Sequence, residues 1–90
     1  MGKYRDRPTI IAELLKAATA GSTKTHLMYN TYTSSPQMNA YLKTVIDCGL
    51  IRFDDGHYFT TQKGLQFIEL VNRMHKLIGT EGQEIAIPVR

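Results

Sequence analysis

Apolar residues at helical spacing occupy the first part of the chain. Pro8 suits the first turn of a helix, because its missing N–H would have no partner there. Gly21 can adopt the left-handed conformation that ends many helices. Between them, four residues form one apolar stripe: Ile11, Leu14, Leu15 and Ala18. The pattern therefore predicts a first helix that Gly21 ends.

A second, shorter helix is predicted directly afterwards. Ser22 or Thr23 can cap it, because either hydroxyl can accept a hydrogen bond from a free N–H of the first turn. Leu27 and Met28 are expected to face inward, with Tyr32 as a further candidate. The segment "YTSS" then predicts a tight connection to the next helix.

A third helix is predicted from signals at both of its ends. Ser34 and Gln37 have the spacing of a capping box. Pro36 instead favours Ser35 as the cap, because a residue before proline avoids the helical region. We predict Ser35 as the cap and Gly49 as the end of this helix.

The third helix divides into an apolar and a polar face. The apolar face holds Met38, Tyr41, Leu42, Val45 and Ile46. The polar face holds Gln37, Asn39, Ala40, Lys43, Thr44 and Asp47. One face is expected to pack on the protein and the other to remain free.

A β-hairpin and a long helix complete the pattern. The runs "LIRF" and "HYFT" flank "DDG", and Asp-Gly suits a hairpin turn that needs positive φ. Thr60 or Thr61 is expected to start the last helix and Gly79 to end it. Its early apolar residues can serve the core: Phe67, Ile68 and Val71.

The later apolar residues of the last helix predict a subunit contact. They have nearly the spacing of a coiled-coil seam and would otherwise leave an apolar patch exposed: Leu70, Met74, Leu77 and Ile78. We favour a homodimer formed through this helix. The alternative is that the tail "EIAIPV" folds back over the patch as a short edge strand, to which Pro88 would confine it.

The order helix, helix, helix, hairpin, helix predicts a mainly α fold with a small β-hairpin. This order is typical of a winged helix-turn-helix, in which the third helix lies in the major groove of DNA. We assign residues 1–79 to this domain, with 65–79 as a long C-terminal dimerisation helix. Residues 80–90 form a C-terminal tail.

Particular residues also resemble the archaeal ArnR-like winged-helix regulators over roughly residues 9 to 70. They are "TKTHLMY", Ser34, Gln37, "YL" at 41–42, "GLI" at 49–51, Tyr58, Thr61, "KG" at 63–64 and Phe67. The resemblance implies an archaeal source, sequence-specific or architectural DNA binding, and often a dimer joined through the last helix. Thr33 and Thr60 stand where such proteins usually have apolar residues, and both are expected to weaken local packing.

Composition and charge agree with a small intracellular domain. The chain has 90 residues, 42% of them hydrophobic and 21% charged, which is ordinary for one globular domain. No apolar run approaches the ~20 residues that cross a bilayer, and no signal-peptide pattern is present, so we expect a cytoplasmic, nucleoid-associated protein and no membrane contact. The net charge of +3 is compatible with nucleic acid without proving it.

The polar face of the third helix supplies the chemistry for DNA contact. Gln and Asn can each bond adenine in two places, and Lys can reach guanine or phosphate. The candidate DNA-binding residues are Lys24, Thr25, Ser34, Ser35, Gln37, Asn39, Lys43, Thr44 and Arg52. The basic arm could lie along the DNA backbone and contains Lys3, Arg5 and Arg7. The same polar face would also suit an ordinary solvated helix.

No enzyme chemistry is expected. The three histidines (His26, His57 and His75) lack the spacing of metal ligands, and Cys48 is expected to be a small buried apolar residue. Asp54 and Asp55 suit a turn better than a catalytic pair. We therefore expect no cofactor, no metal and no small-molecule substrate, and a double-stranded DNA partner. The alternatives are a protein–protein interaction module on the same scaffold and a sequence-nonspecific, chromatin-like architectural DNA binder.

Overall fold

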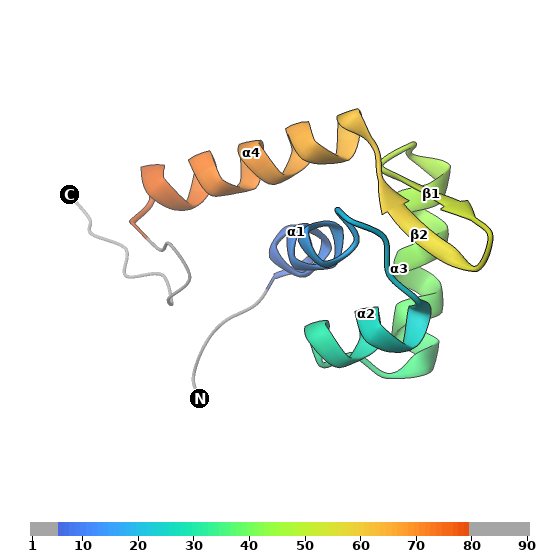
Figure 1. Cartoon of the computed structure of the whole chain (residues 1–90). Helices are drawn as coiled ribbons and strands as arrows, with labels where there is room; N and C mark the ends of the chain where they lie inside the picture. The colour runs from blue at the N-terminus through green and yellow to red at the C-terminus, as the bar shows by residue number, and fades with distance from the viewer. Residues whose placement is uncertain (1–5, 80–90) are drawn as a thin grey trace.

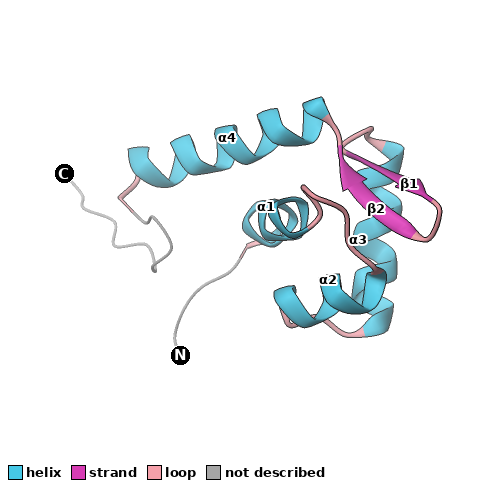
Figure 2. Ribbon diagram, in the orientation of Figure 1, coloured by secondary structure: helices cyan, strands magenta, loops and turns pink. Residues whose placement is uncertain are grey.

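The computed structural model describes residues 6–79. Its elements follow in the order α1 (Arg7–Ala17), α2 (Lys24–Thr31), α3 (Ser35–Asp47), β1 (Ile51–Asp54), β2 (His57–Thr60) and α4 (Gln62–Leu77). In Figure 1, α1 is seen nearly end-on between α4 and α2, and α3 runs beside the hairpin. Figure 2 shows the two strands next to α3 and the start of α4. The predicted order of helices and hairpin is confirmed.

The first helix packs its predicted stripe against the rest of the chain. Asp6 caps α1, because its carboxylate accepts a 2.9 Å hydrogen bond from the N–H of Thr9. All four predicted apolar positions are buried. The helix ends at Ala17 rather than at Gly21. Gly21 lies further on with a φ of +99°, where the ring of Phe59 leaves no room for a Cβ.

The second helix confirms two inward positions and corrects a third. Thr23 caps α2 by accepting from the N–H of His26. Leu27 is buried and Met28 is half-buried, as predicted. Tyr32 is instead 86% exposed. It occupies the C-cap with a φ of +55°, so it has left the helical spiral and the helical period no longer turns its side chain inward.

The third helix starts one residue earlier than predicted. Ser34, not Ser35, is the cap: its hydroxyl accepts from the N–H of Gln37 at 3.3 Å, and its own N–H donates to Gln37 Oε1 at 3.0 Å. Pro36 sits within the first turn, where it lacks only an N–H that would have no helical partner. The two bonds of the capping box outweigh the preference of Ser35 to avoid the helical region.

The apolar face of α3 and its end differ partly from expectation. Met38, Leu42 and Val45 are buried, whereas Ile46 is 41% exposed at the edge of the face. Cys48 is exposed, so the prediction of a buried apolar cysteine is wrong. It forms the C-cap of α3, where its carbonyl accepts a 2.7 Å hydrogen bond from Lys63 Nζ. A small side chain at a C-cap on the surface remains accessible to solvent.

The hairpin is built as predicted and is joined to the end of α1. The antiparallel register pairs Ile51 with Thr60 and Asp54 with His57, which leaves a two-residue turn with positive φ at both positions. A bridge of two backbone hydrogen bonds also links Tyr58 to Ser22. The second strand therefore lies against the segment that follows α1.

Thr60 does not leave an unsatisfied polar group at its position in β2. Its hydroxyl donates a 2.6 Å hydrogen bond to the carbonyl of Leu15, and its N–H donates to the carbonyl of Ala18. Thr33 likewise shares a 3.0 Å hydroxyl contact with Thr31. Each threonine thus exchanges apolar contact for a hydrogen bond, which explains how a polar residue fits there.

The last helix closes the core. Thr61 caps α4 by accepting from the N–H of Gly64. Gly64 lies so close to the carbonyl of Leu50 that a Cβ would collide with that backbone oxygen. The core cluster of buried residues consists of Ile11, Leu14, Leu15, Ala18, Leu27, Met38, Leu42, Val45, Leu50, Ile51 and Ile68. Phe67 packs against this cluster and Val71 is buried, as predicted for the early part of α4.

Candidate nucleic-acid interface

The starts of α2 and α3 are joined by a hydrogen bond between two predicted site residues. Lys24 Nζ donates to Ser35 Oγ at 3.0 Å. Ser35 is therefore not the cap but the partner of a lysine from the neighbouring helix. The two bring one positive charge and one hydroxyl to the N-terminus of α3, which itself favours anions.

The polar face of α3 carries four candidate DNA contacts, and three of them are exposed: Gln37, Asn39 and Lys43. Gln37 uses Oε1 in the capping box, and its NH2 group takes no part in that bond. Asn39 and Lys43 lie one turn apart on one side of this face, and Gln37 lies at its opposite edge. These groups are the donors and acceptors that contacts with base edges require.

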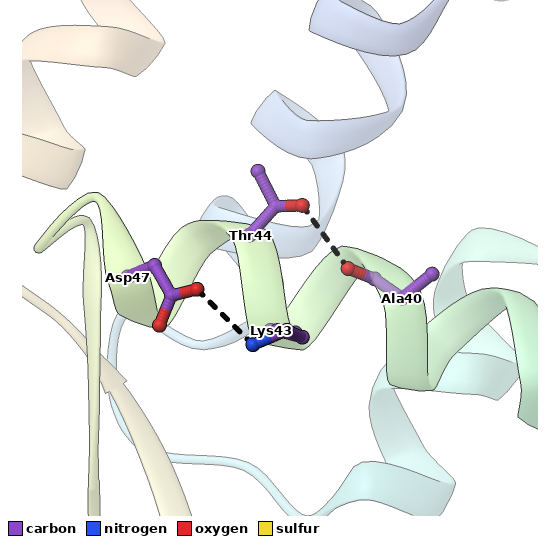
Figure 3. Close-up of polar contacts among 4 residues, drawn as sticks. All are labelled: Ala40, Lys43, Thr44 and Asp47. Carbon is purple, nitrogen blue, oxygen red and sulfur yellow. Dashed lines mark hydrogen bonds and ion pairs between the residues drawn. The ribbon is translucent and has the colours of Figure 1, made fainter.

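Thr44 contributes less to this face than predicted. Figure 3 shows its hydroxyl directed along the helix, where it donates to the carbonyl of Ala40 at 3.2 Å. The residue is also half-buried. A threonine bonded to the turn before it presents mainly its methyl group, so its hydroxyl is not a free donor for DNA.

Lys43 is accompanied by a carboxylate from its own helix. Its Nζ lies 3.4 Å from Asp47 Oδ2, one turn further along α3, as Figure 3 shows. Both side chains are largely exposed. The spacing of four residues could have indicated this pair from the sequence, because such residues are neighbours on a helix surface.

Arg52 is likewise accompanied by an acid within the hairpin. Its guanidinium lies 3.8 Å from Asp54 Oδ2 and 4.6 Å from the centre of the Phe59 ring. Residues two apart in a strand point to the same face, so the sequence could have indicated the ion pair. Phe59 is the direct cross-strand partner of Arg52, so the register of the predicted hairpin could have indicated the ring contact as well. The cation is thus held beside a carboxylate and over an aromatic face.

The segment from Ser22 to Thr60, which contains α2, α3 and the hairpin, has equal numbers of basic and acidic side chains. From Ser22 to Thr60 the basic residues are Lys24, Lys43 and Arg52, and the acidic residues are Asp47, Asp54 and Asp55. The modest basic bias of the whole sequence therefore does not arise here. By contrast, α4 contains three basic residues (Lys63, Arg73 and Lys76) and one acidic residue, Glu69.

Exposed tyrosines form a surface that the sequence analysis missed. Tyr29 is 82% exposed and Tyr32 is 86% exposed. A hollow of about 440 Å³ lies beside them and is lined by Thr25, Met28, Tyr29, Tyr32 and Thr33. Thr25, a predicted DNA contact, thus lies at an aromatic surface. The weak apolar periodicity of α2 could have signalled that its tyrosines face outward.

The basic arm is described only at its last member. The Arg7 guanidinium lies 5.8 Å from the centre of the Tyr41 ring, which brings the start of α1 close to α3. Lys3 and Arg5 lie outside the described residues.

The outer face of α4 presents most of its predicted seam. Leu70 is 59% and Leu77 is 81% exposed, and Ile78 also reaches the surface. Met74 is half-buried. The tail that could cover these residues lies outside the described part of the chain.

A groove of about 420 Å³ lies along the contact between α1 and α4 and is lined by residues of both helices. Within it, Thr9 Oγ1 and His75 Nε2 lie 3.0 Å apart. Residues 6–79 contain no group of three or more histidine, cysteine or acidic side chains placed to hold a metal ion. No helix in the described part of the chain has the length and apolar character to cross a membrane.

Comparisons with known proteins bear on the whole arrangement. A family model described as winged helix-turn-helix matches residues 4–79. A search of curated proteins finds no match. Among solved structures, the chain is similar to the crystal structure of Sso10a-2, a DNA-binding protein from Sulfolobus solfataricus, with a TM-score of 0.72 and 18% identity over 81% of each chain. At that identity the similarity shows a common fold.

Proposed function

The chain belongs to the winged helix-turn-helix family, and we propose on that premise that it binds double-stranded DNA with α3 in the major groove. The observation that carries the proposal is the exposure of Gln37, Asn39 and Lys43 on the polar face of α3. The hydrogen bond between Lys24 and Ser35 adds a charged group at the start of the same helix. Winged helix-turn-helix is a DNA-binding architecture, and we propose no enzymatic activity for the chain.

Two further features support a role as an archaeal transcriptional regulator. The similar structure from Sulfolobus solfataricus carries the description of a DNA-binding protein. The resemblance to ArnR-like regulators covers the same helices and hairpin. We assign the base contacts to the exposed residues of the polar face of α3 (Gln37, Asn39 and Lys43). We assign the phosphate contacts to Lys24, Thr25, Ser34 and Ser35. Binding to DNA would place the protein in the cytoplasm, at the nucleoid.

We also propose that the protein acts as a homodimer through α4. Leu70 and Leu77 are exposed on this helix and Ile78 is exposed at its C-cap, and neighbouring apolar side chains on a surface favour association. Two copies would then present their α3 helices to major grooves ~34 Å apart, or a multiple of that spacing. A twofold arrangement predicts a palindromic site.

The test of DNA binding is a selection from random duplexes by mobility shift, with the mass in solution measured by light scattering. We expect a recovered consensus and an affinity that falls as salt rises, with a log–log slope of about −0.9 for each phosphate contacted. Recovery of binding without a consensus would favour the architectural role. Absence of any salt-dependent binding would contradict the proposal.

A substitution on α3 tests the assignment of its face. Lys43→Ala should weaken binding, by about 1–3 kcal/mol and unequally among sequences if Lys43 contacts a base, or uniformly if it contacts phosphate. Lys16→Ala, an exposed lysine on α1, serves as the matched control. Equal affinities of the Lys43 variant and the parent for every duplex would remove Lys43 from the interface.

The exposed tyrosines support a second candidate function, a protein-interaction module. Tyr29 and Tyr32 flank an apolar hollow, and buried aromatic anchors are typical of protein–protein contacts. The balanced charge between Ser22 and Thr60 also favours this alternative. Replacement of both tyrosines by serine should leave duplex binding unchanged if they serve a protein partner.

A further inference from the structure

Two of the three basic residues on the candidate DNA-binding side have an acid beside them. Lys43 lies 3.4 Å from Asp47 on α3, and Arg52 lies 3.8 Å from Asp54 on β1. The third, Lys24, bonds the neutral hydroxyl of Ser35 instead. The acids therefore accompany the cations that lie furthest along α3 and in the hairpin.

These ion pairs contribute little to stability. All four side chains are largely exposed, and exposed pairs of this kind are worth about 0–1 kcal/mol because water screens them. Asp47 is also in the last turn of α3, where the helix dipole disfavours a negative charge. Folding gives no strong reason for an acid at that position.

The same acids have a larger effect on a polyanion. A phosphate that approaches Lys43 or Arg52 comes within ~8 Å of the neighbouring carboxylate, a distance over which salt does not fully screen repulsion. Each pair therefore attracts DNA less than a lone cation would. Sequence-independent binding depends almost entirely on that attraction, whereas base contacts depend on hydrogen bonds.

Hydrogen bonding to bases is not weakened in the same way. Lys43 can leave Asp47 for a guanine acceptor at small cost, since the pair is weak. The freed Asp47 can then accept a hydrogen bond from the amino group of a cytosine. A matching base pair thus offers both groups a partner, while phosphate offers a partner only to the lysine.

From this geometry we propose that Asp47 and Asp54 are specificity-determining residues that suppress binding to DNA of arbitrary sequence. The proposal rests on the DNA-binding function proposed above. Asp47 acts on α3, where bases are contacted, and Asp54 acts in the hairpin, where contact with the backbone is expected. Together they lower phosphate-driven affinity more than affinity for the correct site.

The test compares Asp47→Asn, Asp54→Asn and the double variant with the parent protein. Each is measured against the duplex recovered by selection and against a random duplex, over a range of salt. Glu69→Gln on α4 is the matched control, because it removes the same charge away from α3 and the hairpin. Denaturant unfolding confirms that every variant is folded.

We expect each aspartate variant to bind random duplex roughly threefold to tenfold more tightly, the effect of removing one repelling charge near a phosphate. The gain for the selected duplex should be smaller, so the ratio of the two affinities falls and the salt dependence on random duplex becomes steeper. Glu69→Gln should change the random-duplex affinity less than about twofold, since screening weakens a more distant charge.

Several outcomes would overturn the inference while the DNA-binding function stands. One is an unchanged ratio of selected to random affinity in the double variant, and another is an equal effect of Glu69→Gln. A parent protein that binds duplexes without sequence preference would also overturn it, because no specificity would exist to lose. If neither the parent nor any variant binds duplex, both the inference and the proposed function fail.

Discussion

At the start of α3, two adjacent serines have separate tasks. Ser34 exchanges two hydrogen bonds with Gln37, and Ser35 accepts one from Lys24. Caps of this kind satisfy N–H groups that the helix leaves free, whereas a bond between exposed side chains contributes less. Ser34 should therefore contribute more to folding stability than Ser35.

We expect Ser34→Ala to lower the free energy of unfolding by about 1 kcal/mol, as the loss of a helix cap typically does. Ser35→Ala should lower it by clearly less and is the control. Urea unfolding followed by circular dichroism measures both. A larger effect at Ser35 would assign the cap to that residue and contradict the geometry.

The carboxylate of Asp6, at the start of α1, makes the stability of the protein depend on pH in the acid range. Hydrogen bonding from Thr9 is the main cause that lowers the pKa of Asp6 below its usual value of 3.8, and the charge of His75 acts in the same direction. A lowered pKa in the folded state means stabilisation that is complete above pH 3.8 and is lost as the pH falls through the lowered value.

Asp6→Asn removes this acid dependence while it keeps an acceptor at the cap. We expect the stability advantage of the parent over the variant to be constant near neutral pH and to shrink as the pH falls below 3.8. Thermal unfolding of both proteins from pH 6 down to about pH 3 would measure the difference. If the unfolding temperatures of the two proteins fell in parallel as the pH was lowered, ionised Asp6 would contribute no pH-dependent stability.

Single residues also mark where a prediction made from the sequence is wrong. Tyr32 and Cys48 both sit at helix C-caps, one exposed beside a hollow and the other exposed beside Lys63. Periodicity assigns a face only while the chain keeps helical angles, and Tyr32 has left them with a φ of +55°. Cys48 keeps right-handed helical angles, and its burial was expected from its residue type alone, which carries no information about its place on the surface. The choice between Ser34 and Ser35 failed because two local preferences conflicted, and only the geometry shows which is stronger.

At the scale of elements, α4 approaches the rest of the fold at Gly64. The carbonyl of Leu50 lies where a Cβ of residue 64 would be, and backbone moves less readily than the end of a side chain. Glycine usually weakens a helix by ~1 kcal/mol relative to alanine. Here it is needed because the helix and the chain before β1 are in close contact.

Gly64→Ala should therefore destabilise the protein, by about 1 kcal/mol or more, although alanine is the better helix former. Gln66→Ala, at an exposed position of the same helix, is the control and should be neutral or slightly stabilising. The denaturant midpoints of the two variants and the parent test the close contact between Gly64 and the carbonyl of Leu50. A stabilised Gly64 variant would contradict it.

The elements themselves could be predicted because each carries its own signals. The stripe of α1, the Asp-Gly turn and the glycine after α3 all act over a few residues, and the structure confirms them. Contacts between elements could not be predicted. Nothing in the sequence indicates that Lys24 reaches Ser35, because that pair depends on how two helices pack. Arg52 and Phe59 differ, because the register set by the Asp-Gly turn places them directly opposite each other in the hairpin.

For the whole molecule, association through α4 is the main prediction. Leu77→Glu places a charge on the most exposed apolar residue of the predicted seam and should convert a dimer to a monomer. Leu65→Glu is the control. At about 100° per residue, Leu65 lies on a different side of the helix from Leu70 and Leu77. Sedimentation of the parent and both variants gives the mass.

Two outcomes would count against the dimer. One is a parent that sediments as a monomer at every concentration, and the other is an equal effect of the two substitutions. In a monomer, the seam residues would remain at the surface or contact a different partner. Binding to a palindromic site would then require a different contact.

The link between β2 and the end of α1 has a consequence for how the chain acquires its fold during synthesis. Ser22 and Tyr58 exchange two backbone hydrogen bonds, and Thr60 donates to Leu15 and Ala18. The amino-terminal helices therefore lack their partner strand until residue 60 has left the ribosome. We expect nascent chains shorter than this to be open to proteases, and protection to appear in one step once the second half of the protein has emerged.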